Sequence, residues 1–353
     1  MPPVAESFSL GAPVEIGRIQ KELKKLWSQS EGVKTRASLI NLAVYSDAPG
    51  SLSRNTELIS RLTEDHACRA IVIQADSDTQ ENNAEAWISA HCHVGRAGSR
   101  QICSEQISFR LGGPVNDLLP NIVFSHLDSD LPFYLWWQAP FRPPIDPLLW
   151  SWVDHLIYDS QTWDDFKAQL DLVDQARNEA DQRIVLCDLN WTRLDKIRVA
   201  TAQFFDPPAA HHHFDTIDHV EVSHAPGYQS TAVLLVCWLA AQLKWRIPGD
   251  RKPGSSLRFT NRVDRQVVVE LHDTAGEPIS SLALRSGAVE FGVKHPTGAD
   301  LLEVTRHDSN ECRLDQLMPA PANDVVGLVS EQLMRGGPHN IYLRVLDLVR
   351  QLI

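Results

Sequence analysis

The sequence predicts an α/β protein in which a mostly parallel sheet is flanked by helices, with a smaller C-terminal antiparallel β region followed by helices. Short apolar runs rich in β-branched residues, such as residues 70–75 (AIVIQA), have the composition of buried strands. They alternate with longer segments in which apolar residues recur at helical spacing, and this alternation is typical of β-α units in a parallel sheet. Beyond residue 256, apolar residues occupy every second position in several segments, which predicts an antiparallel meander.

Elements of the first part follow from these two periodicities. Ile16, Ile19, Leu23 and Leu26 share one face of an expected amphipathic helix. The expected helices cover residues 14–28, 51–64, 115–127, 163–180, 194–205 and 229–245. The expected strands cover residues 38–45, 70–75, 86–94, 106–111, 133–137, 183–187 and 217–222. Residues 146–156 are rich in tryptophan and fit either a helix or a strand.

The pattern changes after Pro248, which predicts two domains. We expect an α/β domain over residues 1–248, a linker over residues 249–256 that is rich in Gly, Pro, Ser and charge, and a β-rich C-terminal domain with terminal helices over residues 257–353. Expected strands and helices of this last part cover residues 267–271, 282–284, 289–293, 324–335 and 339–351.

Charge and hydropathy exclude several classes of partner. The 353 residues carry a formal net charge of -12, which argues against broad binding to nucleic acid or to an anionic membrane. The longest apolar run, residues 232–241, is far shorter than the ~18 residues typical of a membrane span. The first thirty residues lack the uninterrupted apolar region of a signal peptide. We therefore expect a cytoplasmic protein.

The six cysteines are scattered, and no two form a CxxC pair. In a chain of this length we expect reduced, cytosolic thiols and not a disulfide framework. The sequence leaves open which of these cysteines, if any, is redox-regulatory: Cys68, Cys92, Cys103, Cys187, Cys237 and Cys312.

Familiar catalytic motifs are missing. The sequence has no GxGxxG after a strand, no GxxxxGK[ST], no HExxH and no GxSxG, which disfavours a nucleotide-dependent or hydrolytic enzyme. His91-Cys92-His93 has no third ligand at a diagnostic spacing, and the three consecutive histidines at 211–213 cannot all face one point on regular structure. We therefore expect neither a metal nor a cofactor.

Polar residues directly after an expected strand form the best candidate site. Asp188 and Asn190 follow residues 183–187 (RIVLC). At the carboxyl end of a strand in an open α/β sheet they would line a ligand crevice, but residues of these types also cap the helix that follows. Both interpretations stay open, and they are compatible. Trp136 and Trp137 are adjacent in a strand and must point to opposite faces, so at least one is expected in the core.

Several segments, in order along the chain, resemble one protein family. They are His66-Ala67-Cys68-Arg69, Cys103-Ser104-Glu105, residues 130–137 (DLPFYLWW), residues 188–194 (DLNWTRL), residues 203–206 (QFFD), and the apolar helix with Trp238 and Trp245. The family is OpcA, the assembly and activator proteins of glucose-6-phosphate dehydrogenase. Beyond residue 250 the resemblance is looser.

The resemblance implies a non-catalytic protein of the oxidative pentose phosphate pathway that binds glucose-6-phosphate dehydrogenase and promotes its active oligomeric form. In photosynthetic bacteria the family is also linked to control through thioredoxin, which would need two cysteines with Cα atoms within ~7 Å. No pair is close in this sequence, so we do not expect such control here unless the fold supplies a pair. Two alternatives remain, an enzyme acting on a phosphorylated sugar and a metabolite sensor that uses the crevice near Asp188 and Trp191. Candidate residues of the crevice or partner surface are Asp130, Trp136, Trp137, Asp188, Asn190, Trp191 and Arg193.

Overall fold

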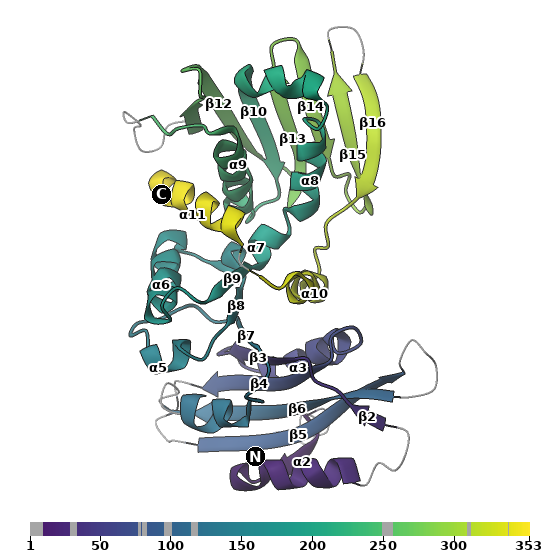
Figure 1. Ribbon diagram of the computed structural model, residues 1–353, viewed down its shortest axis with the longest axis vertical. Helices are drawn as coiled ribbons and strands as arrows, with labels where there is room; N and C mark the ends of the chain where they lie inside the picture. The colour runs from purple at the N-terminus through teal and green to yellow at the C-terminus, as the bar shows by residue number, and fades with distance from the viewer. Residues whose placement is uncertain are drawn as a thin grey trace. The chain divides into compact units, whose positions relative to one another are not determined.

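The chain forms two compact units, each built around its own sheet (Figure 1). The computed structural model describes residues 10–28, 34–76, 79, 83–94, 101–113, 119–248, 257–308, 312–337 and 339–353. The first unit comprises Met1–Tyr158, Ala168–Cys187 and Val329–Gly337. The second comprises Asp159–Lys167, Asp188–Leu328 and Pro338–Ile353.

The first sheet has the strand order β1-β5-β6-β4-β3-β7-β8-β9, with β2 paired to β6. Its strands are β1 (Ala12–Val14), β2 (Lys34–Arg36), β3 (Ile40–Ser46), β4 (Cys68–Asp76), β5 (Asn83–Val94), β6 (Gln101–Gly112), β7 (Phe133–Trp137), β8 (His155–Tyr158) and β9 (Val185–Asp188). The central pairs β6–β4, β4–β3, β3–β7 and β7–β8 are parallel, whereas β1–β5 and β5–β6 are antiparallel. The sheet is therefore mostly parallel, as the sequence predicts.

The direction of strand addition reverses next to β3. From β3 the chain passes through α3 (Ser51–Leu62) to β4 on one side, while β7 on the other side leads on to β8. Leu52, Ile59 and Leu62 on α3 are buried, as are the apolar residues of β4. The apolar face of α3 therefore packs on β4 and covers this part of the sheet. In open α/β sheets such a reversal creates a crevice at the carboxyl ends of the two strands.

Short helices complete the first unit. They are η1 (Ile16–Arg18), α2 (Ile19–Ser28), η2 (Leu119–Val123), η3 (Phe124–His126), α5 (Pro147–Trp150) and most of α6 (Phe166–Glu179). The ambiguous stretch 146–156 contains both elements, since α5 is followed directly by β8. The expected helix over residues 115–127 is, within the described residues, only the two short turns η2 and η3.

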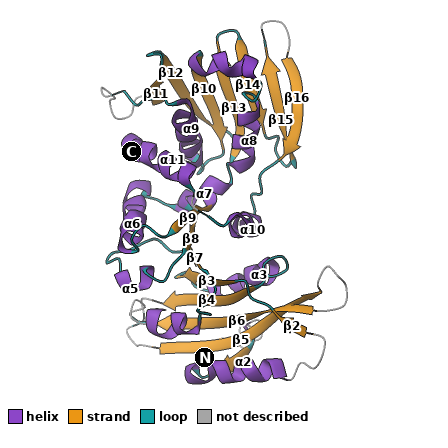
Figure 2. Ribbon diagram, in the orientation of Figure 1, coloured by secondary structure: helices purple, strands orange, loops and turns teal. Residues whose placement is uncertain are grey.

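The second sheet has the order β11-β12-β10-β13-β14-β15-β16 (Figure 2). Its strands are β10 (Ile217–His224), β11 (Leu257–Thr260), β12 (Gln266–Asp273), β13 (Ile279–Ser286), β14 (Val289–Lys294), β15 (Leu301–His307) and β16 (Cys312–Pro319). All neighbours are antiparallel except β10 and β12. The smaller antiparallel region that the sequence predicts is thus present, and it is larger than expected.

The helices of the second unit pack on this sheet or on one another. They are α7 (Leu189–Thr192), α8 (Asp195–Gln203), η4 (Ser160–Thr162), η5 (Pro208–Asp215), α9 (Gln229–Leu243) and α11 (Asn340–Leu352), and α10 (Val325–Arg335) runs from this unit into the first. α9 packs on β10 and β12, α8 packs on β14 and β16, and α11 packs on α9. Within the described parts of the chain, no helix combines the length and the apolar composition that crossing a membrane requires.

The contacts divide the chain differently from the predicted boundary at Pro248. β10 precedes that boundary, yet it pairs with β12 and β13 in the second sheet. Residues 188–248 therefore belong with the β-rich part of the chain. The expected linker over residues 249–256 lies outside the described residues.

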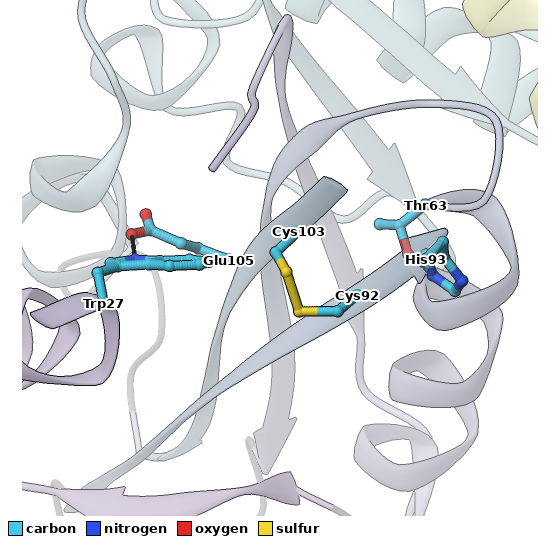
Figure 3. The surroundings of a disulfide bond; sticks show 6 residues. All are labelled: Trp27, Thr63, Cys92, His93, Cys103 and Glu105. Atoms are coloured by element: carbon cyan, nitrogen blue, oxygen red, sulfur yellow. Dashed lines mark hydrogen bonds between the residues drawn. A yellow bond between two sulfur atoms is a disulfide. The ribbon is translucent and has the colours of Figure 1, made fainter. Parts of the chain in front are cut away.

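A disulfide joins Cys92 on β5 to Cys103 on β6, which makes the expectation of six reduced thiols wrong for this pair (Figure 3). The two residues are direct partners in the antiparallel register, and their Cα atoms lie 4.1 Å apart. Trp27 and Glu105 lie to one side of the bond and Thr63 and His93 to the other (Figure 3). Cysteines 11 positions apart meet because strand pairing, which the sequence pattern does not reveal, sets them opposite one another. Cys68, Cys187 and Cys237 are buried and take no part in a disulfide.

Replacing Cys92 and Cys103 with alanine is expected to lower the free energy of unfolding by about 3 kcal/mol in oxidising buffer, since the cross-link closes a short loop and restricts the unfolded chain. Chemical denaturation of the wild type with and without dithiothreitol measures the same effect without substitution. The variant serves as the control, because its unfolding should not respond to the reductant. Equal wild-type midpoints in both buffers would contradict a stabilising role for the bond.

Candidate functional site

The carboxylate of Asp188 is the centre of a buried polar cluster in the second unit. Asp188 ends β9 and is the N-cap of α7, because its Oδ1 accepts a hydrogen bond of 2.9 Å from the Asn190 backbone N–H. The same oxygen accepts from the Ser160 N–H at 3.0 Å. Its Oδ2 accepts from the Ser160 hydroxyl at 2.6 Å and from the Tyr342 hydroxyl at 2.7 Å. Asp188 itself has no exposed surface.

Burial changes the protonation of this group. Burial and, to a smaller extent, the nearby charge of Asp159 raise the pKa of Asp188 to about 6, although the hydrogen bonds from Ser160 and Tyr342 lower it. Loss of water solvation outweighs the donated hydrogen bonds. A carboxyl group therefore titrates in the second unit far above its usual range.

Asn190 extends the cluster and is likewise fully buried. Its side-chain N–H groups donate to the hydroxyls of Ser160 and Ser230, at 3.1 and 3.2 Å. Its carbonyl accepts from the Thr231 hydroxyl at the first turn of α9. The amide thus links η4, α7 and α9.

Arg193 and Trp191 form the edges of the cluster. Arg193 donates two parallel hydrogen bonds to the carboxylate of Asp159, at 2.8 and 2.6 Å, which is the strong bidentate geometry of this pair. Trp191 is buried, with the guanidinium of Arg198 stacked 3.4 Å from its ring centroid and the ring of Tyr342 5.4 Å away. The ring of Trp191 is thus contacted by two residues, and Arg193 is held by both oxygens of Asp159.

The arrangement is suited to holding elements together and not to reacting with a substrate. Each Asp188 oxygen already accepts two hydrogen bonds, and neither Asp188 nor Asn190 is exposed. The helix-cap interpretation of Asp188 matches this geometry. The partners Ser160, Thr231 and Tyr342 were not found from the sequence, because each lies on an element remote along the chain from the strand–helix junction.

Three of the seven candidate residues belong to the first unit. Asp130 is exposed. Trp136 is 2% exposed and part of the core. Trp137, on the opposite face of β7, is half-buried and stacks on Tyr45 with ring centroids 3.9 Å apart. The expectation that at least one tryptophan is core is confirmed for Trp136.

Trp137 borders a pocket of about 300 Å³ within the first unit. Tyr45 at the end of β3 and Trp137 at the end of β7 place it at the reversal of strand order described above. Phe141 and Trp150 add two more aromatic walls, and Arg142 at the edge pairs with Asp47 at 3.0 Å. Among the described residues the buried indole Nε1–H of Trp137 has no hydrogen-bond partner. The pocket has the position, size and polarity of a small-molecule site.

Two of the segments singled out in the sequence meet beside the disulfide. Arg69 on β4 and Glu105 on β6 are both buried, with 3.6 Å between their charged groups, and Arg36 lies 3.1 Å from the same carboxylate. Trp27 on α2 donates to the other oxygen of Glu105. Ser104 accepts from the backbone of Cys68. These residues tie α2, β4 and β6 together, which is a structural role.

Two family models match the chain, and both describe a subunit of glucose-6-phosphate dehydrogenase. The model of its N-terminal domain matches residues 59–175, and the model of its C-terminal domain matches residues 184–346. A Synechocystis protein described as a putative OxPP cycle protein, OpcA, is 25% identical over 221 residues. The matched region is 60% of this chain and 45% of that protein, so this chain spans less than half of the relative's length.

Solved structures give only distant likenesses. An aldose-aldose oxidoreductase from Caulobacter crescentus is 8% identical with a TM-score of 0.47, over 88% of this chain and 96% of that one. An oxidoreductase domain protein from Kribbella flavida is 10% identical with a TM-score of 0.45, over 88% and 90% of the two chains. Likenesses at this level carry no functional information.

The pKa of Asp188 predicts a pH dependence of stability. Because the folded-state value, about 6, lies above the ordinary value of 3.8, folding favours the protonated acid. Its stabilisation is fully present below the unfolded pKa and is lost as the pH rises through the folded pKa. Between about pH 4 and pH 6 this group should lower the free energy of unfolding by up to ~1.4 kcal/mol per pH unit.

Asp188→Asn should remove that slope, because the amide keeps one acceptor for the two backbone N–H groups and offers its N–H₂ to the hydroxyls of Ser160 and Tyr342, which can rotate to accept. Asp188→Ala is the contrasting variant. It leaves buried donors unpaired and should cost at least about 2 kcal/mol at every pH. Urea denaturation across this pH range measures both, and a wild-type slope that persists in the asparagine variant would contradict the assignment.

Proposed function

Because the chain belongs to the OpcA family, we propose that it binds glucose-6-phosphate dehydrogenase and favours the active oligomeric state of that enzyme without carrying out catalysis itself. The observation that carries the proposal is the pair of family matches, in order along the chain, over residues 59–175 and 184–346. Both families are described as domains of a glucose-6-phosphate dehydrogenase subunit. The pathway is then the oxidative pentose phosphate pathway, and the location the cytoplasm.

The geometry of the best polar cluster supports a non-catalytic role. A general base or nucleophile must come within about 3 Å of a reacting atom. Asp188 is fully buried and its two oxygens are occupied by donors from Ser160, Asn190 and Tyr342. We assign Asp188 and Asn190 a positioning role, in which they hold η4, α7 and α9 in one arrangement and so shape the surface that meets the partner. The alternative of an enzyme acting on a phosphorylated sugar gains no support from this cluster.

Activation requires a difference in affinity. The chain must bind the active state of the dehydrogenase more tightly than the inactive state, and a coupling free energy of ~1–3 kcal/mol changes the affinity about 5- to 150-fold. By linkage, any ligand that selects the active dehydrogenase also tightens its complex with this chain.

The disulfide gives redox control a physical basis. The fold supplies the close cysteine pair that thioredoxin-type control needs, at a Cα separation of 4.1 Å. Cys103 is fully buried and Cys92 is half-buried, so a thiolate would attack the sulfur of Cys92. Cys68 would be a poor nucleophile for attack on this disulfide, because burial raises the pKa of its thiol to about 12.

The pocket beside Trp137 favours a second function, metabolite sensing. Its aromatic walls and its Arg142–Asp47 edge suit a small polar molecule with an apolar face. A ligand there should raise the unfolding midpoint of the wild type, by an amount that grows with ligand concentration. Trp137→Ala, which removes one wall, should abolish that rise, and a rise that persists would place the ligand elsewhere.

The direct test mixes the purified chain with glucose-6-phosphate dehydrogenase from the same organism. We expect a lower apparent Michaelis constant for glucose 6-phosphate and a shift of the enzyme to a larger assembly, measured by initial rates and by light scattering. The chain alone, assayed with sugar phosphates and nicotinamide cofactor, is the control and should give no turnover.

Redox state is the second variable of that test. The assay should be run with oxidised and reduced wild type and with the Cys92→Ala/Cys103→Ala variant. An effect of reductant that the variant lacks supports control through this disulfide. No binding and no kinetic effect in either buffer would reject the activator proposal, and turnover by the chain alone would favour the enzyme alternative.

A further inference from the structure

Two short segments that are far apart in the sequence lie on neighbouring strands of the second sheet. His219-Val220-Glu221 lies on β10, and Glu270-Leu271-His272 lies on the adjacent strand β12. The strands are parallel and their register sets Glu221 opposite Glu270. Alternate residues of a strand share a face, so His219 and Glu221 point away from the buried Val220 and Val222, toward the face that also carries Glu270 and His272.

The donor atoms of His219, Glu221 and Glu270 all lie within 4.8 Å of one another, close enough to share one cation. Nε2 of His219 lies 3.0 Å from Oε1 of Glu221 and 3.7 Å from Oε2 of Glu270. Nε2 of His272 lies 3.6 Å from the same oxygen of Glu270. Tetrahedral zinc with bonds of about 2.0–2.2 Å sets its ligands about 3.3–3.5 Å apart. Small side-chain adjustments would therefore bring the donors to bonding distance.

The local charge favours a dication. Three carboxylates, from Glu221, Glu270 and Glu290, surround one guanidinium, that of Arg285. Arg285 donates to Glu290 at 2.8 Å and lies 2.9 Å from Oε1 of Glu221. The three carboxylates and the one guanidinium sum to a formal charge of -2, which a divalent ion would neutralise.

We propose that His219, Glu221 and Glu270 bind a divalent transition-metal ion such as zinc. Imidazole nitrogen and carboxylate oxygen are the donors such an ion takes in proteins. Arg285 then orients the Glu221 carboxylate from outside the coordination sphere. The site is independent of the proposed dehydrogenase partner, and it differs from the expectation of no metal drawn from the sequence.

The rival explanation is a network of surface ion pairs without a metal. The side chains of His219 and Glu221 are 22% and 30% exposed, and those of Glu270 and His272 are 46% and 49% exposed, so water could solvate each charge separately. Only a metal predicts stoichiometric binding that depends on residues from both strands. The experiment is built on that difference.

Full-length chain without a polyhistidine tag, stripped with a chelator and dialysed, should be titrated with zinc chloride by calorimetry. We expect one zinc ion to bind per chain, with a dissociation constant below about 10 µM. His219→Ala and Glu270→Gln should each weaken binding at least about tenfold, and circular dichroism verifies that the variants fold. Substituting Co²⁺ should give the visible absorption of a tetrahedral site, which either variant loses.

The matched control is His211→Ala/His212→Ala, which removes two histidines of the cluster at residues 211–213 and should leave the high-affinity binding unchanged. Loss of binding in this control, with normal binding in His219→Ala, would show an adventitious site and overturn the proposal. A dissociation constant above about 0.1 mM for the wild type would overturn it as well.

Discussion

The carboxylate of Asp188 holds four donors from three separate stretches of the chain, and it does so out of reach of water. Its hydrogen bonds join Ser160, Asn190 and Tyr342 in one cluster. A buried carboxylate is costly unless its acceptor positions are filled, so the cluster must be complete to be stable. This requirement fixes the relative positions of η4, α7 and α11 within the second unit. Asn190 adds the first turn of α9, and α9 in turn packs on β10 and β12.

Local patterns in the sequence predicted local structure well. The helical face of residues 51–64 became α3, the apolar run 70–75 became the middle of β4, and the strand–helix junction at Asp188 became a capped helix. Such features depend on residues within a few positions of one another. The α/β class followed because the alternation of strand and helix patterns survives in the sequence regardless of which strands pair.

Long-range pairing was beyond the reach of the same reasoning. β10 resembles other strands of the α/β part, and only its register with β12 and β13 assigns it to the second sheet. Cys92 and Cys103 look unrelated until β5 and β6 pair, and the same holds for Glu221 and Glu270 on β10 and β12. In the candidate site, Asp188 was predicted from its residue type after a strand, whereas no feature of the sequence predicted Tyr342. A hydrogen bond between residues 154 positions apart produces no periodic pattern in the sequence from which it could be predicted.

The interleaved division of the chain has a consequence for synthesis on the ribosome. The second unit takes its polypeptide from three separate stretches, the last of which includes α11. Tyr342 is therefore synthesised long after Ser160, and 154 positions after the carboxylate of Asp188 to which it donates. Until then the carboxylate lacks one of its donors, and α9 lacks the helix that covers it. The first unit likewise waits for Val329–Gly337. A nascent chain that stops before Val329 therefore leaves both units unfinished.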